Sequence, residues 1–331
     1  MTNVRDTLAE LVRINSVNPE WGGPGESGVA RWIRHFFERA AIEVWEEECL
    51  PGRNNVMARL PGADPNRRVL LEAHMDTVSA SNMGFAPFDP VIDKGRMRGR
   101  GSCDVKAGLA AMVHAIYALK KHGHVPPCEI IFAAVVDEEH AYRGVLRLIE
   151  SLQDSTLPEA AVVAEPTELR LVRANKGVLR WKIVTYGKSV HSAHPKRGHN
   201  AISDMAKVIL ALEDHFADLE KTTHPLLGAG SGSIGLIEGG EQINIVPSRC
   251  EIKVDRRLLP GESAADALAQ CEAALAQLRT RHPQLNVKME APSLADEAME
   301  TPAHSEVVKS ASRVLRSQGL NGEPIGVSFG C

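Results

Sequence analysis

The stretch FAAVVDEEHAYRG, residues 132–144, runs five apolar residues directly into three consecutive acids, Asp137, Glu138 and Glu139. The apolar run is typical of a buried strand. Carboxylates that share a partly dry site repel one another strongly unless a cation lies between them. The stretch therefore predicts a strand inside an α/β sheet whose end faces a divalent metal ion.

The bulk composition is that of an ordinary globular protein. The 331 residues are long for a single core, so two domains are expected. A net charge of −4 gives no electrostatic reason to expect nucleic acid or an anionic membrane as partner. Apolar runs such as 130–136 are far too short to cross a bilayer, and the amphipathic start of the chain lacks an apolar signal core. These features predict a cytoplasmic protein.

Six cysteines are widely spaced and form no C-x-x-C pair. In a chain of this size they are expected to be reduced thiols and not a disulfide framework. They are Cys49, Cys103, Cys128, Cys250, Cys271 and Cys331.

The first half of the chain alternates strand and helix patterns. Apolar runs predict strands over 68–78, 128–136 and 160–167, and helical spacing predicts helices over 27–43, 105–123 and 143–152, with Ser27 as a candidate N-cap. Continuous apolar strands separated by helices favour an α/β domain with a mostly parallel sheet that helices flank on both faces.

The pattern changes near residue 175. Residues 178–190 alternate with period two, and long helices are predicted over 200–220 and 263–282. This order predicts an inserted α+β domain over 175–286. The metal-binding catalytic domain is then expected to comprise 1–174 and 287–331.

Further candidate ligands stand at the ends of other predicted elements. His74 and Asp76 lie in AHMDTV, Asp104 lies in GRGSCDVKAG ahead of a helix, and Glu165 lies in VVAEPT. Ligands of open α/β sheets bind at the carboxyl ends of the strands, so these side chains are expected to meet the acids of the opening stretch. Imidazole and carboxylates without thiolates suit a zinc-like catalytic site, and a carboxylate can bridge two metals.

Each candidate has an ordinary structural explanation when taken alone. His74 would fit a structural histidine, Asp76 a turn or cap, the Glu138–Glu139 pair a solvated loop, and Glu165 a turn before Pro166. Together these explanations require four coincidences at four strand or loop ends. A shared metal site explains all four at once.

Seven motifs then identify a family resemblance that covers nearly the whole chain. The chain resembles the zinc-dependent family that includes aminoacylase, acetylornithine deacetylase, succinyl-diaminopimelate desuccinylase and carboxypeptidase G. The motifs, in the family's order, are HMDTV, GRGSCDVKAG, DEEH, AEPT, GKSVHSAHPKRGHNAI, GGEQINIVP and VDRRLLPGE.

The resemblance implies two divalent metal ions, zinc first and cobalt as an alternative, bridged by Asp104. One ion would also bind His74 and Glu165. The other would bind Glu139 and a histidine from the C-terminal part of the chain. The peptide bond after the bridging aspartate is usually cis in this family, which predicts a cis Asp104–Val105 bond.

The resemblance also implies catalytic roles for Asp76 and Glu138. Asp76 would orient His74 through the second ring nitrogen. Glu138 would be the general base, pointing to the opposite side from its ligating neighbour Glu139. Two cations lower the pKa of a shared water, and Glu138 would take its proton during attack on an amide carbonyl.

His191 would stabilise the oxyanion from across a dimer interface made by the inserted domain, so a homodimer is expected. A structural role for His191 is an equally good account of that residue alone.

Asn244 and Arg257 resemble the family's substrate-binding pair, with Arg257 holding a carboxylate in a two-pronged contact. The alternative for Arg257 is a salt bridge to Asp255 or Glu262. Arg256 is expected to be its exposed neighbour on the same strand.

The chain stops at NGEPIGVSFGC, where the resemblance implies a further segment that carries the last metal-binding histidine. We therefore expect a C-terminally incomplete catalytic domain, from either a fragment or a shortened natural product.

These features predict a metal-dependent amide hydrolase that removes an N-acyl group from an amino acid. Glu165 favours this choice, because glutamate at that ligand position tends to accompany acylases of the family and aspartate tends to accompany peptidases. A di- or tripeptidase acting on short peptides is one alternative. A truncated, catalytically impaired binding or dimerisation protein is the other.

Overall fold

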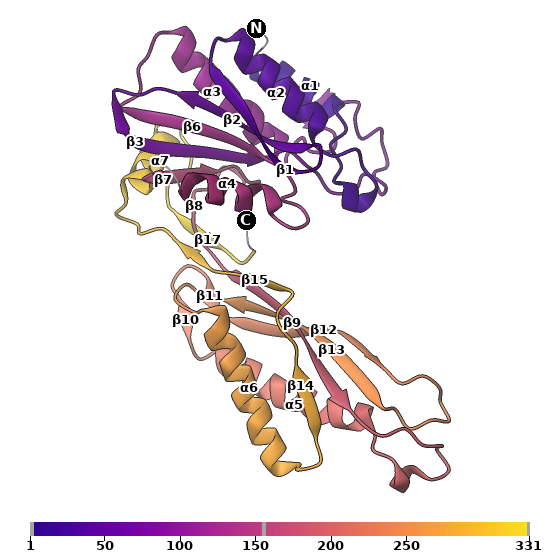
Figure 1. Ribbon diagram of the computed structural model, residues 1–331. Helices are drawn as coiled ribbons and strands as arrows, with labels where there is room; N and C mark the ends of the chain where they lie inside the picture. The colour runs from indigo at the N-terminus through magenta and orange to yellow at the C-terminus, as the bar shows by residue number, and fades with distance from the viewer. Residues whose placement is uncertain (1–2, 154–156, 330–331) are drawn as a thin grey trace. The chain divides into compact units, whose positions relative to one another are not determined.

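The structure is a computed structural model that describes residues 3–153 and 157–329 (Figure 1). It is a mixed α/β fold. Residue contacts divide the chain into two units, Met1–Glu168 and Leu169–Cys331, and each unit has its own hydrophobic core. The assignment of 175–286 to an inserted domain, with 287–331 returning to the catalytic domain, stays a prediction.

The first unit is built on a five-stranded sheet of order β1-β2-β6-β3-β7. Strand β3 runs parallel to β6 and to β7, whereas β2 is antiparallel to both β1 and β6. The sheet is therefore mixed, and a mostly parallel sheet is not confirmed. Its strands are β1 (Glu43–Leu50), β2 (Arg53–Leu60), β3 (Asp64–His74), β6 (Cys128–Val135) and β7 (Ala160–Val163), and β4 (Val91–Asp93) pairs separately with β5 (Arg96–Arg98).

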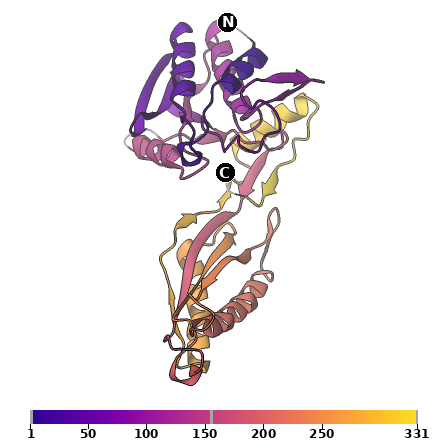
Figure 2. The ribbon, with the colours of Figure 1, turned by 90° about the vertical axis from the view of Figure 1, so that its right-hand side faces the viewer.

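Helices cover both faces of this sheet (Figures 1 and 2). Helices α1 (Val4–Arg13), α2 (Ser27–Arg39) and α3 (Lys106–Lys121) pack on one face, and α4 (Arg143–Gln153) packs on the other. Every residue of β6 is buried. Ile130, Phe132 and Ala134 face the three-helix layer, and the residues between them face Leu148 of α4. This two-sided burial explains the unbroken apolar run that the sequence shows.

Helix α2 begins at Ser27, but its N-cap is Glu26, which makes no side-chain capping bond. The prediction of Ser27 as N-cap is therefore wrong by one residue. The Glu26 carboxylate is used elsewhere, because it accepts hydrogen bonds from Arg53 and from the backbone N–H of Asp137.

The strand register brings the candidate ligands to one edge of the sheet. His74, the last residue of β3, lies opposite Val135 at the end of β6, and Glu72 lies opposite Val163 at the end of β7. Since the three strands are parallel, their carboxyl ends meet at the same edge. The segments that follow β6 and β7 carry Glu138, Glu139 and Glu165.

The second unit contains an antiparallel sheet of order β12-β13-β9-β14, with β15 also paired to β9. Helices α5 and α6 pack against one face of it. The predicted period-two strand and both long helices are present. Their bounds are β9 (Gly177–Tyr186), α5 (Ala201–Leu219), β12 (Ser231–Gly239), β13 (Arg249–Leu258), α6 (Ala264–Arg281), β14 (Asn286–Met289) and β15 (Leu294–Asp296).

Smaller elements complete the second unit. Strand β8 is paired antiparallel with β16 and parallel with β17. The remaining bounds are β8 (Val172–Asn175), β10 (Thr223–His224), β11 (Gly228–Ala229), β16 (Met299–Glu300), α7 (Glu306–Ser317) and β17 (Ile325–Val327).

Within residues 3–153 and 157–329, no helix has the length and apolar character needed to cross a membrane. Five of the six cysteines are free thiols in the structure, and Cys331 lies outside the described residues.

Candidate metal centre

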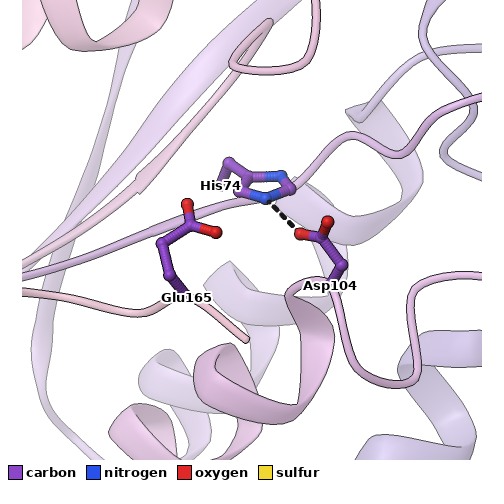
Figure 3. Close-up of side chains that lie close together, drawn as sticks. All are labelled: His74, Asp104 and Glu165. Carbon is purple, nitrogen blue, oxygen red and sulfur yellow. Dashed lines mark hydrogen bonds and ion pairs between the residues drawn. The ribbon is translucent and has the colours of Figure 1, made fainter. Parts of the chain in front are cut away.

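Three predicted ligands converge in the first unit. His74 ends β3, Asp104 lies two residues before α3, and Glu165 lies two residues after β7. Each offers a ligand atom, and the three atoms lie within 4.8 Å of one another. Figure 3 shows both carboxylates turned toward the imidazole ring. Groups that are 30 to 91 residues apart in sequence therefore form one cluster, as the sequence predicts.

The hydrogen bonds of His74 leave one ring nitrogen facing the carboxylates. Its Nδ1 lies 3.0 Å from the backbone carbonyl oxygen of Asp76, which only accepts, so Nδ1 carries a hydrogen. Its Nε2 lies 3.0 Å from Oδ1 of Asp104 and 3.9 Å from Oε2 of Glu138. In the neutral ring the lone pair is then on Nε2. This is the tautomer that can bind a metal between the acids.

A second group of possible ligands shares the same histidine. His74, Glu138 and Glu139 also place one ligand atom each within 4.8 Å of one another. The structure thus brings together His74, Asp104, Glu138, Glu139 and Glu165.

The electrostatics of the cluster fit a bound cation. Burial and the neighbouring carboxylates raise the pKa of Glu138 to about 7, and the same two causes raise the pKa of Glu165 to about 7. Burial and Asp104 also raise the pKa of Glu139. For His74, burial opposes protonation, but the hydrogen bond to Asp104 and the nearby carboxylates of Asp76 and Glu138 outweigh it and hold the pKa well above its ordinary value. A divalent ion would relieve the repulsion among carboxylates that, together with burial, raises the pKa values of the three glutamates.

Asp76 contacts both His74 and the chain after β6, and its predicted role in orienting His74 stays a prediction. The backbone carbonyl of Asp76, and not its carboxylate, is the hydrogen-bond partner of His74, because the carboxylate lies 3.6 Å from Nδ1. The carboxylate is engaged by the chain after β6. It accepts the backbone N–H of Glu138 at 3.1 Å and that of Glu139 at 3.2 Å. Asp76 therefore positions the two glutamates directly.

Asp137 is a site residue to which the sequence pattern assigned no role. It is fully buried and has a positive φ of 65°. Its carboxylate accepts hydrogen bonds from Arg53, Arg143 and Asn18. Burial alone would raise the pKa of Asp137, but these donors outweigh it and lower the pKa. The signal in the sequence is the third acid of DEE, since only two acids are needed as base and ligand.

The segment that carries Asp104 is also fixed by buried contacts. The Asp104–Val105 peptide bond is cis, as the resemblance predicts. Lys106 is fully buried, and its ammonium donates hydrogen bonds to the backbone carbonyls of Leu11 and Ile14 at the end of α1. These contacts hold the start of α3 beside the sheet edge.

Glycine at position 108 allows α3 to approach the segment after β7. A Cβ atom at Gly108 would lie 2.5 Å from the Cβ of Ala164, the neighbour of Glu165. This close approach sets the separation between the elements that carry Asp104 and Glu165.

Two predicted substrate-binding residues occupy paired loops of the second unit. The N–H of Ser192 donates to the carbonyl of Asn244 at 2.9 Å, and His191 forms a β-bridge with Ile245. The Nδ1 of His191 accepts the N–H of Ala193 at 3.1 Å. A cavity of about 560 Å³ lies beside these loops. The roles of His191 and Asn244 stay predictions.

The two neighbouring arginines of β13 are arranged differently from expectation. Arg256 is fully buried under α6, where it donates to Glu262, to Gln270 and to a backbone carbonyl. The prediction that it is exposed is wrong, because strand alternation turns it toward the helices. Arg257 lies on the other face and pairs with Asp255 at 2.8 Å. This is one of the two salt bridges considered for it, and its substrate role stays a prediction.

The chain is similar to known proteins over most of its length. The model of Peptidase family M20/M25/M40 matches residues 70–330. A protein named "Probable carboxypeptidase" of Aspergillus terreus is 34% identical over 218 residues, which are 63% of this chain and 49% of that protein. A protein named "Probable succinyl-diaminopimelate desuccinylase" of Staphylococcus aureus is 27% identical over 281 residues, 76% of this chain and 68% of that protein.

A solved structure shares the fold. The aminopeptidase PepT from Bacillus cereus has a TM-score of 0.79 at 23% identity, covering 99% of this chain and 85% of that chain. By sequence, the chain spans 49 to 63% of the lengths of three fungal relatives that it matches. The family model covers most of the chain, including His74, Asp104, the two glutamates and Glu165. The chain belongs to Peptidase family M20/M25/M40, a family of hydrolases.

Proposed function

We propose that the chain is a metal-dependent amide hydrolase that removes an N-acyl group from an amino acid. The observation that carries the proposal is the convergence of His74, Asp104 and Glu165 with Glu138 and Glu139 at one sheet edge. Glutamates with strongly raised pKa values gather at functional sites, and Glu138 and Glu165 are two such groups beside a histidine.

Two divalent ions, zinc first and cobalt as an alternative, fit this donor set. His74, Asp104 and Glu165 would hold one ion, and Asp104 with Glu139 and the further histidine that the resemblance implies would hold the other. When bound, two such cations lower the pKa of a shared water molecule and polarise the carbonyl of the substrate.

Glu138 is the proposed general base. Its side chain is partly accessible, with 22% exposed, and it faces the same space as the ligand atoms of His74. It would accept the proton of the attacking water and return it to the amine that leaves. Asp76 supports this role by accepting the backbone N–H groups of Glu138 and Glu139.

The choice between an acylase and a peptidase rests on Glu165. Glutamate at this ligand position favours deacylation of N-acyl amino acids, and the staphylococcal relative is named as a desuccinylase. A peptidase acting on short peptides is the second candidate, supported by the Aspergillus relative named as a carboxypeptidase. In either case Arg257 and Asn244 are proposed to bind the substrate and His191 to stabilise the oxyanion.

A homodimer formed through the second unit is part of the proposal. Strand β12 is at the edge of its sheet, and its Leu236 and Ile237 are 61% and 59% exposed. An exposed edge strand with apolar side chains is a natural surface for pairing with a second chain.

Turnover by the full chain tests the proposed function. After loading with zinc or cobalt, the protein is expected to hydrolyse members of a panel of N-acetyl and N-succinyl amino acids in preference to di- and tripeptides. Glu138→Gln should retain the metal ions and lose about 10²- to 10⁴-fold in kcat. Exposed Glu159→Gln, which removes the same charge from the same unit, should leave kcat unchanged.

Other results would redirect or refute the proposal. Turnover of peptides alone would establish the second candidate. Full metal loading without turnover of either class would favour a binding or dimerisation protein. An unaltered rate in Glu138→Gln would exclude Glu138 as the base.

A further inference from the structure

We propose that Asn18 is a positioning residue of the centre: its side-chain amide ties the carboxylates of Asp76 and Asp137 together and thereby fixes the backbone of Glu138 and Glu139. The expected effect on kcat rests on the proposed function. The expected effect on zinc affinity rests only on the cluster of possible ligands.

The two hydrogens of the Asn18 amide point at two different carboxylates. Its Nδ2 lies 2.7 Å from Oδ2 of Asp76 and 3.0 Å from Oδ1 of Asp137. Its Oδ1 accepts the backbone N–H of Glu20 at 3.1 Å, so the orientation of the amide is fixed by all three partners. Asn18 is 1% exposed, and a carboxylate in its place would face two other carboxylates in a buried site.

Both carboxylates act on the segment that carries the base and a ligand. Asp76 accepts the N–H groups of Glu138 and Glu139, one on each carboxylate oxygen. Asp137 begins the same segment, and its backbone carbonyl accepts the N–H groups of Ala141 and Tyr142. Of the side chains described in this paragraph, the Asn18 amide is therefore the one that joins Asp76 to Asp137, the two residues that hold the segment of Glu138 and Glu139.

The remaining partners of Asp137 show what the asparagine adds. Arg53 binds Oδ1 of Asp137 and also Glu26, and Arg143 binds Oδ2. These cations attach Asp137 to its own surroundings. Asn18 is different because it connects Asp137 to Asp76, which follows His74 by two residues and thus lies at the end of the neighbouring strand.

The backbone of Asn18 is held as firmly as its side chain. Its N–H donates to the carbonyl of Thr77 at 2.9 Å, and the N–H of Thr77 donates to the carbonyl of Ser16 at 3.1 Å. The N-terminal segment thus runs alongside the residues after β3. Asn18 is pre-positioned to set the spacing between the ends of β3 and β6.

Two substitutions separate positioning from packing. Asn18→Asp keeps the volume and the acceptor for the Glu20 N–H, but it places an acceptor against two carboxylates. Asn18→Ala removes the side chain without adding charge. A donor role predicts that Asp is the more damaging change, whereas a packing role predicts that Ala is. The matched control is Asn15→Asp, since exposed Asn15 only accepts the N–H of Val17 and aspartate preserves that bond.

The experiment measures zinc affinity by competition with a chelator, and kcat and KM on the best substrate, for the full chain. Asn18→Asp is expected to lower zinc affinity and kcat by about 10- to 100-fold each. Mutations of residues that support metal ligands commonly have effects of this size. Asn18→Ala should lower both less, and Asn15→Asp should match wild type. KM should change by less than about twofold, because Asn18 acts through Glu138 and not on the substrate. In a Glu138→Gln background the loss of kcat caused by Asn18→Asp should largely vanish.

The result that overturns the proposal is an Asn18→Asp protein within twofold of Asn15→Asp in zinc affinity, or one less impaired than Asn18→Ala. If Asn18→Asp does not fold, zinc affinity of Asn18→Ala equal to that of wild type overturns it as well. If wild type binds zinc but hydrolyses nothing, the proposed function fails, and the affinity series still decides the role of Asn18.

Discussion

The acids in and around the cluster fall into two groups, according to whether their surroundings raise or lower their pKa values. Burial and neighbouring carboxylates raise the pKa of both Glu138 and Glu165 to about 7. For Asp76 and Asp137, hydrogen-bond donors outweigh burial and lower the pKa. Acids with raised pKa values face the ligand space, and acids with lowered pKa values anchor the backbone behind it. This division matches the proposed roles, in which Glu138 and Glu165 act at the metal ions and Asp76 and Asp137 support the backbone.

The raised pKa values predict that the metal-free protein loses stability as pH rises from about 4.5 to about 7. A carboxyl group whose pKa is higher in the folded than in the unfolded state binds more protons when folded. Its contribution to the free energy of unfolding therefore falls as the pH rises from about 4.5 to about 7. A shift of this size corresponds to up to about 3 kcal/mol for an isolated group, and less for two that interact. His74 extends the decline above pH 6.5, where its raised pKa keeps it protonated only in the folded state. Asp76 and Asp137, whose pKa values are lowered, lose their contribution to stability only as the pH falls below 3.8.

Urea denaturation at a series of pH values, with a strong chelator present, measures this dependence. Glu165→Gln should flatten the decline between pH 4.5 and 7, and saturating zinc should reverse it because zinc binds the ionised carboxylates. A pH dependence identical in wild type and Glu165→Gln would show that Glu165 is not buried as described.

The sequence predicted the residues that cluster at the candidate metal centre better than the residues that support them. His74, Asp104, Glu138, Glu139 and Glu165 follow strand ends or precede a helix, where chemistry on an α/β sheet is expected. The supporting side chains come from segments without such a signal: Asn18 precedes a 3₁₀ turn over Pro19–Trp21, Glu26 precedes α2, and Arg53 begins β2. Only the folded chain shows that they meet at Asp137.

Among the strands and helices, those with strong apolar patterns could be predicted from the sequence. The antiparallel hairpin of β1 and β2 could not. Strand β6 is buried on both faces and α3 has helical spacing up to Lys121, so both follow from their patterns. Strand β1, EVWEEECL, has four acids in eight residues and no fully buried position. It is a strand because it pairs with β2, and this antiparallel hairpin makes the sheet mixed.

The contact between α3 and the end of β7 gives a prediction at this scale. Alanine is favoured over glycine in a helix by about 1 kcal/mol, so propensity alone predicts that Gly108→Ala stabilises the protein. The added Cβ would instead meet the Cβ of Ala164 at 2.5 Å and push Asp104 and Glu165 apart. We expect Gly108→Ala to lower both the free energy of unfolding, by about 1 to 3 kcal/mol, and the affinity for zinc.

Thermal unfolding and zinc titration measure both effects. The double variant Gly108→Ala with Ala164→Gly should recover most of each loss, because the second change removes the atom that clashes. Stabilisation by Gly108→Ala with zinc affinity unchanged would refute the role of this contact.

At the scale of the whole molecule, composition and pattern changes predicted more than one domain, and the structure has two units with separate cores. The sequence pattern predicts domain boundaries at 174/175 and 286/287, and these bounds stay predictions. It could not predict the pairing of β8 with β16 and β17, since these strands are two to four residues long and pair across more than a hundred residues. Which larger domain they complete stays a prediction.

The proposed homodimer is tested by molar mass in solution. The wild-type chain is expected to have twice its monomer mass by sedimentation equilibrium, and Leu236→Glu combined with Ile237→Lys should reduce it to the monomer mass, because charges would line the edge of β12. Val125→Lys, at an apolar position of the first unit that is 70% exposed, should remain dimeric. A monomeric wild-type chain, or a dimer in the double variant, would contradict the proposed interface.

Anomalous X-ray diffraction at the zinc absorption edge tests whether His74, Asp104 and Glu165, distant in sequence, hold one metal centre. Crystals of the full chain grown with zinc should show an anomalous peak about 2.0 to 2.2 Å from Nε2 of His74 and from carboxylate oxygens of Asp104 and Glu165. Zinc peaks confined to other histidines, with none between these three side chains at saturating zinc, would contradict the account.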